Sequence, residues 1–299
     1  LISTTSNGSI TFNVGDDAVV NGDITVAGAA SRVTFNMDPS AGDAEAASNA
    51  NDGATLTIAT DPASDVSVIT TNSAGNAAAG TFINGGDQND TFNFGPQPTT
   101  DFVVNGNPPV FGDADVPPGD ILNLDLVNVT RGNAILTIGD PDVGDDAAAG
   151  TFTFQNPETE QSVRYTSIET VSAVDSTNPM TDADYHLVVD LGIVGPRAAG
   201  ASTLGYQDGT ADTVDIRLNA AGSGDVEVRI DDGAGAVQVF AGQNDQILSL
   251  TVIGTDDDET VVLTETAAGL PSFSTLDEDA GMNSIALAAP AINNTANNG

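Results

Sequence analysis

Apolar and polar residues alternate with a period of two along most of the chain. The alternation is clearest in the runs Ser9–Val14, Ala54–Thr60, Ile121–Val129, Thr213–Leu218 and Asp225–Ile230. In each run, aliphatic or phenylalanine side chains alternate mainly with polar ones, which is typical of a strand with one buried face. Clusters of glycine, asparagine, aspartate and proline lie between the runs and favour turns. The pattern therefore predicts an all-β protein.

No segment shows a convincing helical pattern. The best candidate, the alanine-rich Gly42–Ala50, lacks an amphipathic stripe and is too short to be stable alone. Strand signals recur about every 9–14 residues, which indicates a sandwich, a barrel or a solenoid. Aromatic residues make up only 5% of the chain, whereas sandwich cores usually depend on large aromatic side chains. We therefore favour a parallel β-solenoid resembling a β-helix, with tandem β-sandwich domains as the alternative.

Two features suggest how the chain is organised. The hexapeptide AAAGTF occurs at Ala77–Phe82 and again at Ala147–Phe152, and each copy leads into a predicted strand. The segment Asp175–Asp184 is polar, contains proline and carries no strand signal. We therefore predict a β-rich repeat domain over residues 1–175 and a second β-rich domain with a polar C-terminal tail over residues 176–299.

The composition is strongly acidic and excludes some partners. The formal net charge is −37, from 43 acids and six bases, all of them arginine. Such a surface repels nucleic acid and anionic membranes, and no apolar run is long enough for membrane insertion. It attracts hard cations, above all calcium, although a halophile's solvated acidic coat gives the same composition. With no cysteine, the fold has no disulfide framework.

One segment carries a recognisable binding pattern. Residues Ile83–Phe94 read INGGDQNDTFNF, close to the calcium-binding repeat G-G-x-G-x-D-x-U-x, in which U is a large apolar residue. The two glycines correspond to Gly85 and Gly86, the aspartate to Asp90 and U to Phe92, while glutamine replaces the third glycine. In such a repeat, the glycines let the turn direct carbonyl groups inward, and the aspartate completes a calcium site between successive turns.

Other glycine-led acidic turns follow, of which Gly254–Val262 (GTDDDETVV) is the most acidic. Its four adjacent acids repel one another, so the turn is either a solvated edge or a place for a cation. Acidic turns are commonly turns only, with no metal. Our candidate calcium ligands are Asp87, Asn89, Asp90, Asp256, Asp257 and Asp258.

Taken together, INGGDQNDTFNF, PPGDILNLDLVNVT, GTFTF and YTSIETV resemble a known group of sequences. They are similar to the degenerate haemolysin-type (RTX-like) calcium-binding repeats of large repetitive bacterial cell-surface and extracellular proteins. The resemblance covers about residues 80–175, and more loosely 205–265. It implies secretion, calcium at acidic turns and an adhesive or structural role, and it brings no catalytic residue.

Few other residues point to chemistry. The single histidine, His186, has no nucleophile signature nearby, so we expect a structural or surface role and predict no catalytic residue. Arg164, Arg217 and Arg229 fall at outward positions of predicted strands, and we expect them to neutralise acids on neighbouring strands. N-glycosylation signals occur by sequence at Asn7, Asn89, Asn128 and Asn293 and stay unassigned.

These features favour an extracellular structural protein that self-assembles into a filament, sheath or surface layer, assisted by calcium. The chain begins at Leu1 without methionine, so we expect a mature or excised part of a longer protein. The N-terminal segment Leu1–Val14 is our candidate for a strand or end-to-end contact between copies. The alternatives are a monomeric calcium-binding adhesin module that recognises a glycan or protein, and a carbohydrate-active enzyme on a β-helix.

Overall fold

A computed structural model of the chain shows an architecture of strands and turns. No α-helix occurs among the residues that the structure describes, so the prediction of an all-β protein is confirmed. The described residues are 2–4, 8–28, 30–37, 53–60, 67–71, 79–86, 89–107, 119–138, 149–175, 185–191, 212–218, 225–231, 236–243, 246–254, 260–264, 273–277 and 284–287.

The strands form three sheets, here called A, B and C. Sheet A has the order β1 (Ile2–Thr4), β4 (Ile24–Val26), β7 (Ile69–Thr71). Sheet B has the order β2 (Ser9–Val14), β5 (Arg32–Met37), β8 (Gly80–Asn84), β10 (Phe102–Asn105), β14 (Val163–Thr166), β13 (Gly150–Phe154), β12 (Ala134–Ile138), β16 (Tyr185–Asp190), β20 (Ile247–Ile253), β22 (Phe273–Asp277). Sheet C has the order β3 (Ala18–Val20), β6 (Thr55–Ile58), β9 (Thr91–Phe94), β11 (Ile121–Asp125), β15 (Thr170–Val174), β19 (Val237–Gln243), β18 (Asp225–Asp231), β17 (Thr213–Leu218), β21 (Thr260–Thr264), β23 (Ser284–Leu287).

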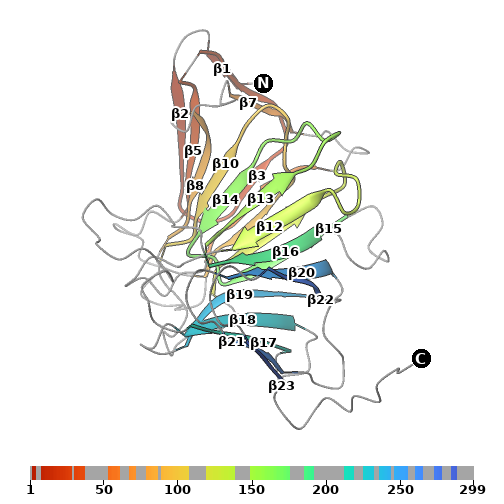
Figure 1. Ribbon diagram of the computed structural model, residues 1–299. Coiled ribbons are helices and arrows are strands. Elements are labelled where there is room, and N and C mark those ends of the chain that lie inside the picture. The colour runs from red at the N-terminus through yellow and green to blue at the C-terminus, as the bar shows by residue number, and fades with distance from the viewer. Residues whose placement is uncertain are drawn as a thin grey trace.

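Successive segments of the chain stack on one another in parallel. Up to β11 the chain passes repeatedly from a strand of sheet B to a strand of sheet C, and a strand of sheet A precedes each of the first three pairs. Each such pass, and likewise that of β14 and β15, is called a rung here. Each rung bonds to the previous one in parallel register, so that Asn13, Asn36, Asn84 and Asn105 lie side by side in sheet B. Figure 1 shows the N-terminal strands at one end of the molecule and β17, β21 and β23 at the other. The strand direction turns progressively between the two ends, as sheet twist requires.

Two antiparallel meanders interrupt this stacking, one in each sheet. In sheet B the chain enters at β12 and fills back through β13 to β14, which pairs in parallel with β10. In sheet C it enters at β17 and fills back through β18 to β19, which pairs in parallel with β15. Each meander adds the same number of strands to its sheet, so both sheets end with ten strands.

The inward faces of the sheets pack into one hydrophobic core. The alternation seen in the sequence places every second side chain of most strands inside, as in β11, where Leu122 and Leu124 are buried between more exposed neighbours. Residues of different sheets meet there, since the ring of Phe94 in sheet C stacks on Phe102 in sheet B at 4.4 Å between centroids. The two sheets are therefore layers of one core.

Outward-facing asparagines form hydrogen-bonded ladders across the parallel strands. In sheet B the Asn84 amide donates to Asn36 Oδ1 at 2.8 Å, and the Asn36 amide donates to Asn13 Oδ1 at 2.7 Å. In sheet C the Asn123 amide donates to Asn93 Oδ1 at 2.8 Å. Identical amide side chains suit this geometry because each one both donates and accepts.

The predicted boundary between residues 175 and 176 falls between β15 and β16, and both large sheets contain strands from either side of it. The two copies of AAAGTF do not mark equivalent positions. Phe82 in β8 lies on the outer face under the guanidinium of Arg32, whereas Phe152 in β13 is fully buried. The predicted polar tail lies outside the described residues.

Candidate functional site

Three acidic side chains are buried in a column at the corner where the chain passes from sheet B to sheet C. Asp90, Asp120 and Glu169 each directly precede a strand of sheet C, namely β9, β11 and β15. These strands pair in register, so the three acids occupy the same place in successive rungs. They are 0, 0 and 2% exposed, which is rare for acids.

Each acid of the column binds the backbone of the rung before it. One oxygen of Asp90 accepts a hydrogen bond from the Ala54 amide at 2.7 Å, and one of Asp120 accepts from the Asp90 amide at 2.6 Å. Glu169 Oε2 accepts from the Asp120 amide at 2.6 Å. The second oxygen of Asp90 accepts from Gly86 N. The column therefore joins four rungs through side chains, in addition to the strand hydrogen bonds.

Glycines give these carboxyl groups their space. A Cβ on Gly85 would lie 2.5 Å from Asp90 Oδ2, and a Cβ on Gly106 would lie 2.2 Å from Asp120 Oδ2 and 1.9 Å from the Ser167 carbonyl oxygen. Successive corners therefore approach so closely that side chains at these two positions are excluded. Among the residues that match the haemolysin-type pattern, Gly85 thus has a packing reason for being glycine.

Burial changes the protonation of the column. Burial raises the pKa of Asp120 to about 10, the Asp90 amide hydrogen bond opposes this rise, and the nearby carboxylates of Glu169 and Asp90 add to it. Burial likewise raises the pKa of Glu169 to about 7. Asp120 Oδ2 and Glu169 Oε1 have no hydrogen-bond partner among the described residues. Asp120 is therefore neutral at pH 7, which lowers the cost of burying it.

The structure separates the predicted calcium ligands. Asp90 is buried and binds backbone amides, while Asn89 is half-buried beside it. Asp87, Asp256, Asp257 and Asp258 lie outside the described residues. Within the described part of the chain, no group of three or more histidine, cysteine, aspartate or glutamate side chains is arranged to hold a metal ion. Calcium binding therefore stays a prediction that depends on the acidic turns.

His186 pairs with a serine on the outer face of sheet B. Its Nδ1 lies 2.6 Å from Ser249 Oγ, on the neighbouring strand β20. A serine nucleophile activated by histidine also needs a group that orients the imidazole, commonly a carboxylate. Near Nε2 the structure places Gly132, whose Cβ would lie at 3.8 Å. The contact is consistent with a cross-strand pair, the structural role expected for His186.

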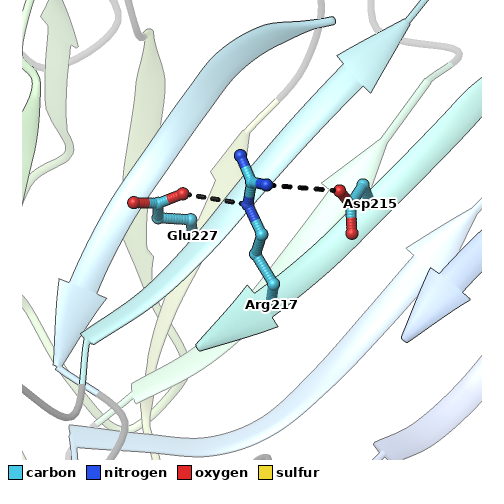
Figure 2. A network of polar contacts seen from close by, with 3 residues as sticks. All are labelled: Asp215, Arg217 and Glu227. Atoms are coloured by element: carbon cyan, nitrogen blue, oxygen red, sulfur yellow. Dashed lines mark hydrogen bonds and ion pairs between the residues drawn. The ribbon is translucent and has the colours of Figure 1, made fainter. Parts of the chain in front are cut away.

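Of the three arginines predicted to neutralise acids on neighbouring strands, Arg217 does so on the β17–β18 pair, whereas Arg229 Nε is buried without a hydrogen-bond partner among the described residues. Figure 2 shows Arg217 between two carboxylates, with its Nε 3.1 Å from Glu227 on the neighbouring strand and a terminal nitrogen 3.8 Å from Asp215. Arg217 and Glu227 are directly opposite in the antiparallel register. All three side chains are partly exposed, so the network stabilises the outer face of sheet C and carries no chemistry of its own.

The N-terminal end of the core is open. A cavity of about 310 Å³ lies between β1, β2 and β3. Apolar side chains of the first two rungs line it, chiefly Ile2, Phe12, Val14, Val20, Ile24 and Phe35. Ile2 is 46% exposed, and Val19 beside it is 63% exposed. The first rung therefore leaves apolar surface that a further rung would cover.

Sequence reasoning found Asp90 but did not single out Asp120 or Glu169, although both lie in the segments quoted for the resemblance. The signal was an acid directly before an alternating strand, as in DTF, DIL and ETV. Uneven spacing concealed it, because the hydrogen-bonded partners are 36, 30 and 49 residues apart.

Comparisons of the chain with protein-family models, curated proteins and solved structures gave no match. No helix among the described residues is long and apolar enough to cross a membrane.

Proposed function

We propose that this chain is a β-solenoid that serves as a secreted, self-assembling structural protein of a filament, sheath or surface layer. The observation that carries the proposal is the stack of parallel rungs whose first member leaves its apolar core open. Solenoids of this kind require capped or paired ends to stay soluble, and a second copy can supply the pairing.

The features of the stack also favour a structural role over a catalytic one. The polar side chains that the structure brings together, the asparagine ladders and the buried acids, bind one another or the backbone of the next rung. Such contacts stabilise a long stack, and among the described residues they place no nucleophile beside an oriented base. A non-enzymatic function at a cell surface or in an extracellular matrix agrees with this arrangement.

The role of calcium in this proposal is to reduce the repulsion between acidic copies. Copies with a formal charge of −37 repel one another, and a divalent cation at acidic turns lowers that repulsion. In this scheme calcium assists assembly by binding at turns such as GTDDDETVV, as the resemblance to haemolysin-type repeats suggests.

Negative-stain electron microscopy of the purified chain in millimolar calcium tests the proposal. We expect regular filaments or sheets that dissolve when the calcium is chelated. Polymers that survive chelation would leave self-assembly in place and remove the role of calcium. Dispersed single particles in calcium would contradict self-assembly and favour the monomeric adhesin module, whose glycan or protein partner could then be sought by binding screens.

A further inference from the structure

We infer that copies of this chain stack head to tail, with the open edges of β2 and β3 in one copy pairing in parallel with β22 and β23 of the next. This inference rests on the proposed self-assembly and specifies its interface. Among the described strands, β2 and β3 each have one neighbour, at the N-terminal end of sheets B and C, and β22 and β23 each have one at the other end. Among the described strands, each large sheet thus ends in an edge strand at either end of the molecule.

Strand direction matches between the two ends. In sheet B the strands from β2 to β14 are parallel, two antiparallel steps follow, and the strands from β12 to β22 are parallel again. Sheet C likewise has two antiparallel steps, between β19 and β17, before β21 and β23. Because two reversals restore the original direction, β22 runs parallel to β2 and β23 runs parallel to β3. A second copy in the same orientation therefore continues both sheets with the pairing used inside the chain.

The backbone of β2 is ready to accept such a neighbour. The Arg32 amide donates to the Gly8 carbonyl at 3.3 Å, which fixes the bonding side of alternate residues. Within a parallel sheet, alternate residues of a strand bond to opposite neighbours. The amides of Ser9, Thr11 and Asn13 therefore point to the open edge. Asn13 is also the end of the asparagine ladder, so its amide is the next donor for a further strand.

The edge strands lack the usual protection against such pairing. Exposed edges commonly carry charges or proline, which prevent the addition of another strand. In this chain of 43 acids, β1, β2, β3 and β23 contain no charged residue and no proline, and β22 contains one aspartate. The charged residues that lie in strands are concentrated in β17 and β18, and β18 (DVEVRID) alone has four. The uncharged edges suit a partner that is itself as acidic as this chain.

The open cavity at the N-terminal end also favours a second copy of the chain as the partner. Its lining comes from β1, β2 and β3 and from the rung behind them, so a rung placed on the end would close it. Pairing one end with the other is heterologous, and each added copy exposes a new N-terminal end. Such an interface propagates without closure and gives a filament.

Blocking the N-terminal edge while keeping the C-terminal edge tests the inference. Thr11→Pro removes an amide that points to the open edge, whereas its control Thr11→Val keeps that amide and a β-branched side chain. Ile2→Asp places a charge at the mouth of the cavity and provides an independent second block. We expect Thr11→Val to polymerise like the wild type and the two blocked variants to stay monomeric, with melting temperatures close to that of Thr11→Val.

Mixing gives the decisive readout. A blocked chain can still add to a filament through its C-terminal edge, and it then ends growth at that end of the filament. At about one blocked chain per ten wild-type chains, filaments measured by electron microscopy should shorten to an average of about ten copies, while the Thr11→Val mixture keeps the wild-type length.

Three results would contradict the inference. Blocked variants that are folded and polymerise like the wild type would show that another surface makes the polymer, leaving the proposed self-assembly intact. Blocked variants that neither polymerise nor shorten wild-type filaments would show that the C-terminal edge does not pair with the N-terminal edge. A wild-type chain that forms no polymer would contradict the proposed function itself, and this outcome is recognised without any variant.

Discussion

The first four rungs and the β17–β18 pair solve the same problem of polar surface in different ways. In the first four rungs, parallel pairing places like residues side by side, and the outer face of sheet B carries Asn13, Asn36 and Asn84 in a ladder. In the antiparallel pair, opposite charges face each other, with Arg217 against Glu227. Stacking like on like suits amides, which donate and accept, whereas it would set like charges against each other. The comparison teaches that the pairing direction determines which polar residues a strand can use.

The pairing direction also governs the buried acids. Asp90, Asp120 and Glu169 are stacked like on like in the parallel part, where three charges would repel. The structure avoids this by giving each acid a backbone amide and by keeping Asp120 neutral at pH 7. The parallel part therefore depends on protonation and close backbone approach, and the antiparallel pair depends on ion pairing.

The largest effect should come from filling the corner of the parallel part. Gly106→Ala would place a Cβ 1.9 Å from the Ser167 carbonyl oxygen, so we expect the free energy of unfolding to fall by about 3 kcal/mol or more. Gly15→Ala is the control, because a Cβ there has no atom within 4 Å, and its effect should stay below about 0.5 kcal/mol. Both values come from urea unfolding. Equal effects would show that the corners are not closely packed.

The pH dependence of stability should be the next largest effect. The folded-state pKa values of Asp120 and Glu169 are about 10 and about 7, above those of an unfolded chain, so the folded protein holds more protons. The stabilisation that these two groups provide is thus fully present below about pH 4 and is lost as pH rises. The loss continues up to about pH 7 for Glu169 and up to about pH 10 for Asp120.

Asp120→Asn isolates the larger part of this dependence. The amide keeps an oxygen for the Asp90 N–H and cannot ionise, so we expect the variant to lose about 2 kcal/mol less than the wild type between about pH 6 and pH 8. Glu158→Gln is the control, since hydrogen bonds from Thr130 and Asn133 lower the pKa of this exposed acid. The contribution of Glu158 is constant between about pH 6 and pH 8 and is lost only as pH falls into the acid range, so Glu158→Gln and the wild type should have parallel curves in that window. Parallel pH curves for the wild type and Asp120→Asn would contradict the burial of an ionisable column.

Breaking the asparagine ladder should have a smaller effect. Asn36 both donates and accepts in the ladder, so Asn36→Ala should cost about 1–2 kcal/mol of stability. Asn13→Ala removes a single ladder bond at the exposed edge and should cost about half as much. Thermal unfolding of the two variants under conditions that keep the chain monomeric gives the comparison. A larger effect for Asn13 would contradict the ladder as a cooperative feature of the interior rungs.

The smallest effect should come from the ion pair of the antiparallel part. Arg217→Met should cost about 0.5–1 kcal/mol at low salt and less at high salt, because the charges are partly exposed and screened. A double-mutant cycle with Glu227→Gln measures the pair itself. Neither variant should change the pH dependence described for Asp120. A coupling energy that does not respond to salt would contradict the ion-pair origin.

The sequence predicted the local structure well, because a strand with one buried face requires apolar residues at every second position. Ser9–Val14 and Thr213–Leu218 coincide with β2 and β17, and Ile121–Val129 contains β11. The repeated hexapeptide was less informative. Its two copies differ in which face carries the phenylalanine, since the facing of a strand depends on its neighbours and not on six residues alone.

The candidate site could be predicted only in part. Asp90 was found through the glycines before it, but its two stacked equivalents were not, because corner segments of unequal length separate them in the sequence. The meanders were also beyond prediction from pattern. β8 (GTFIN) and β13 (GTFTF) begin with the same three residues, yet β8 pairs in parallel and β13 antiparallel, so the partners decide the pairing direction.

The meanders also determine the order in which strands can pair when the chain becomes available from its N-terminus onward. Each strand from β5 to β11 finds a waiting edge on which to add. β12 finds none, because its neighbours β13 and β16 both come later in the chain. β12 cannot join sheet B until β14 pairs with β10, so β12, β13 and β14 join as one cooperative unit. The same delay recurs at β17, so a chain that emerges in sequence would complete its core in a few large steps after a gradual start.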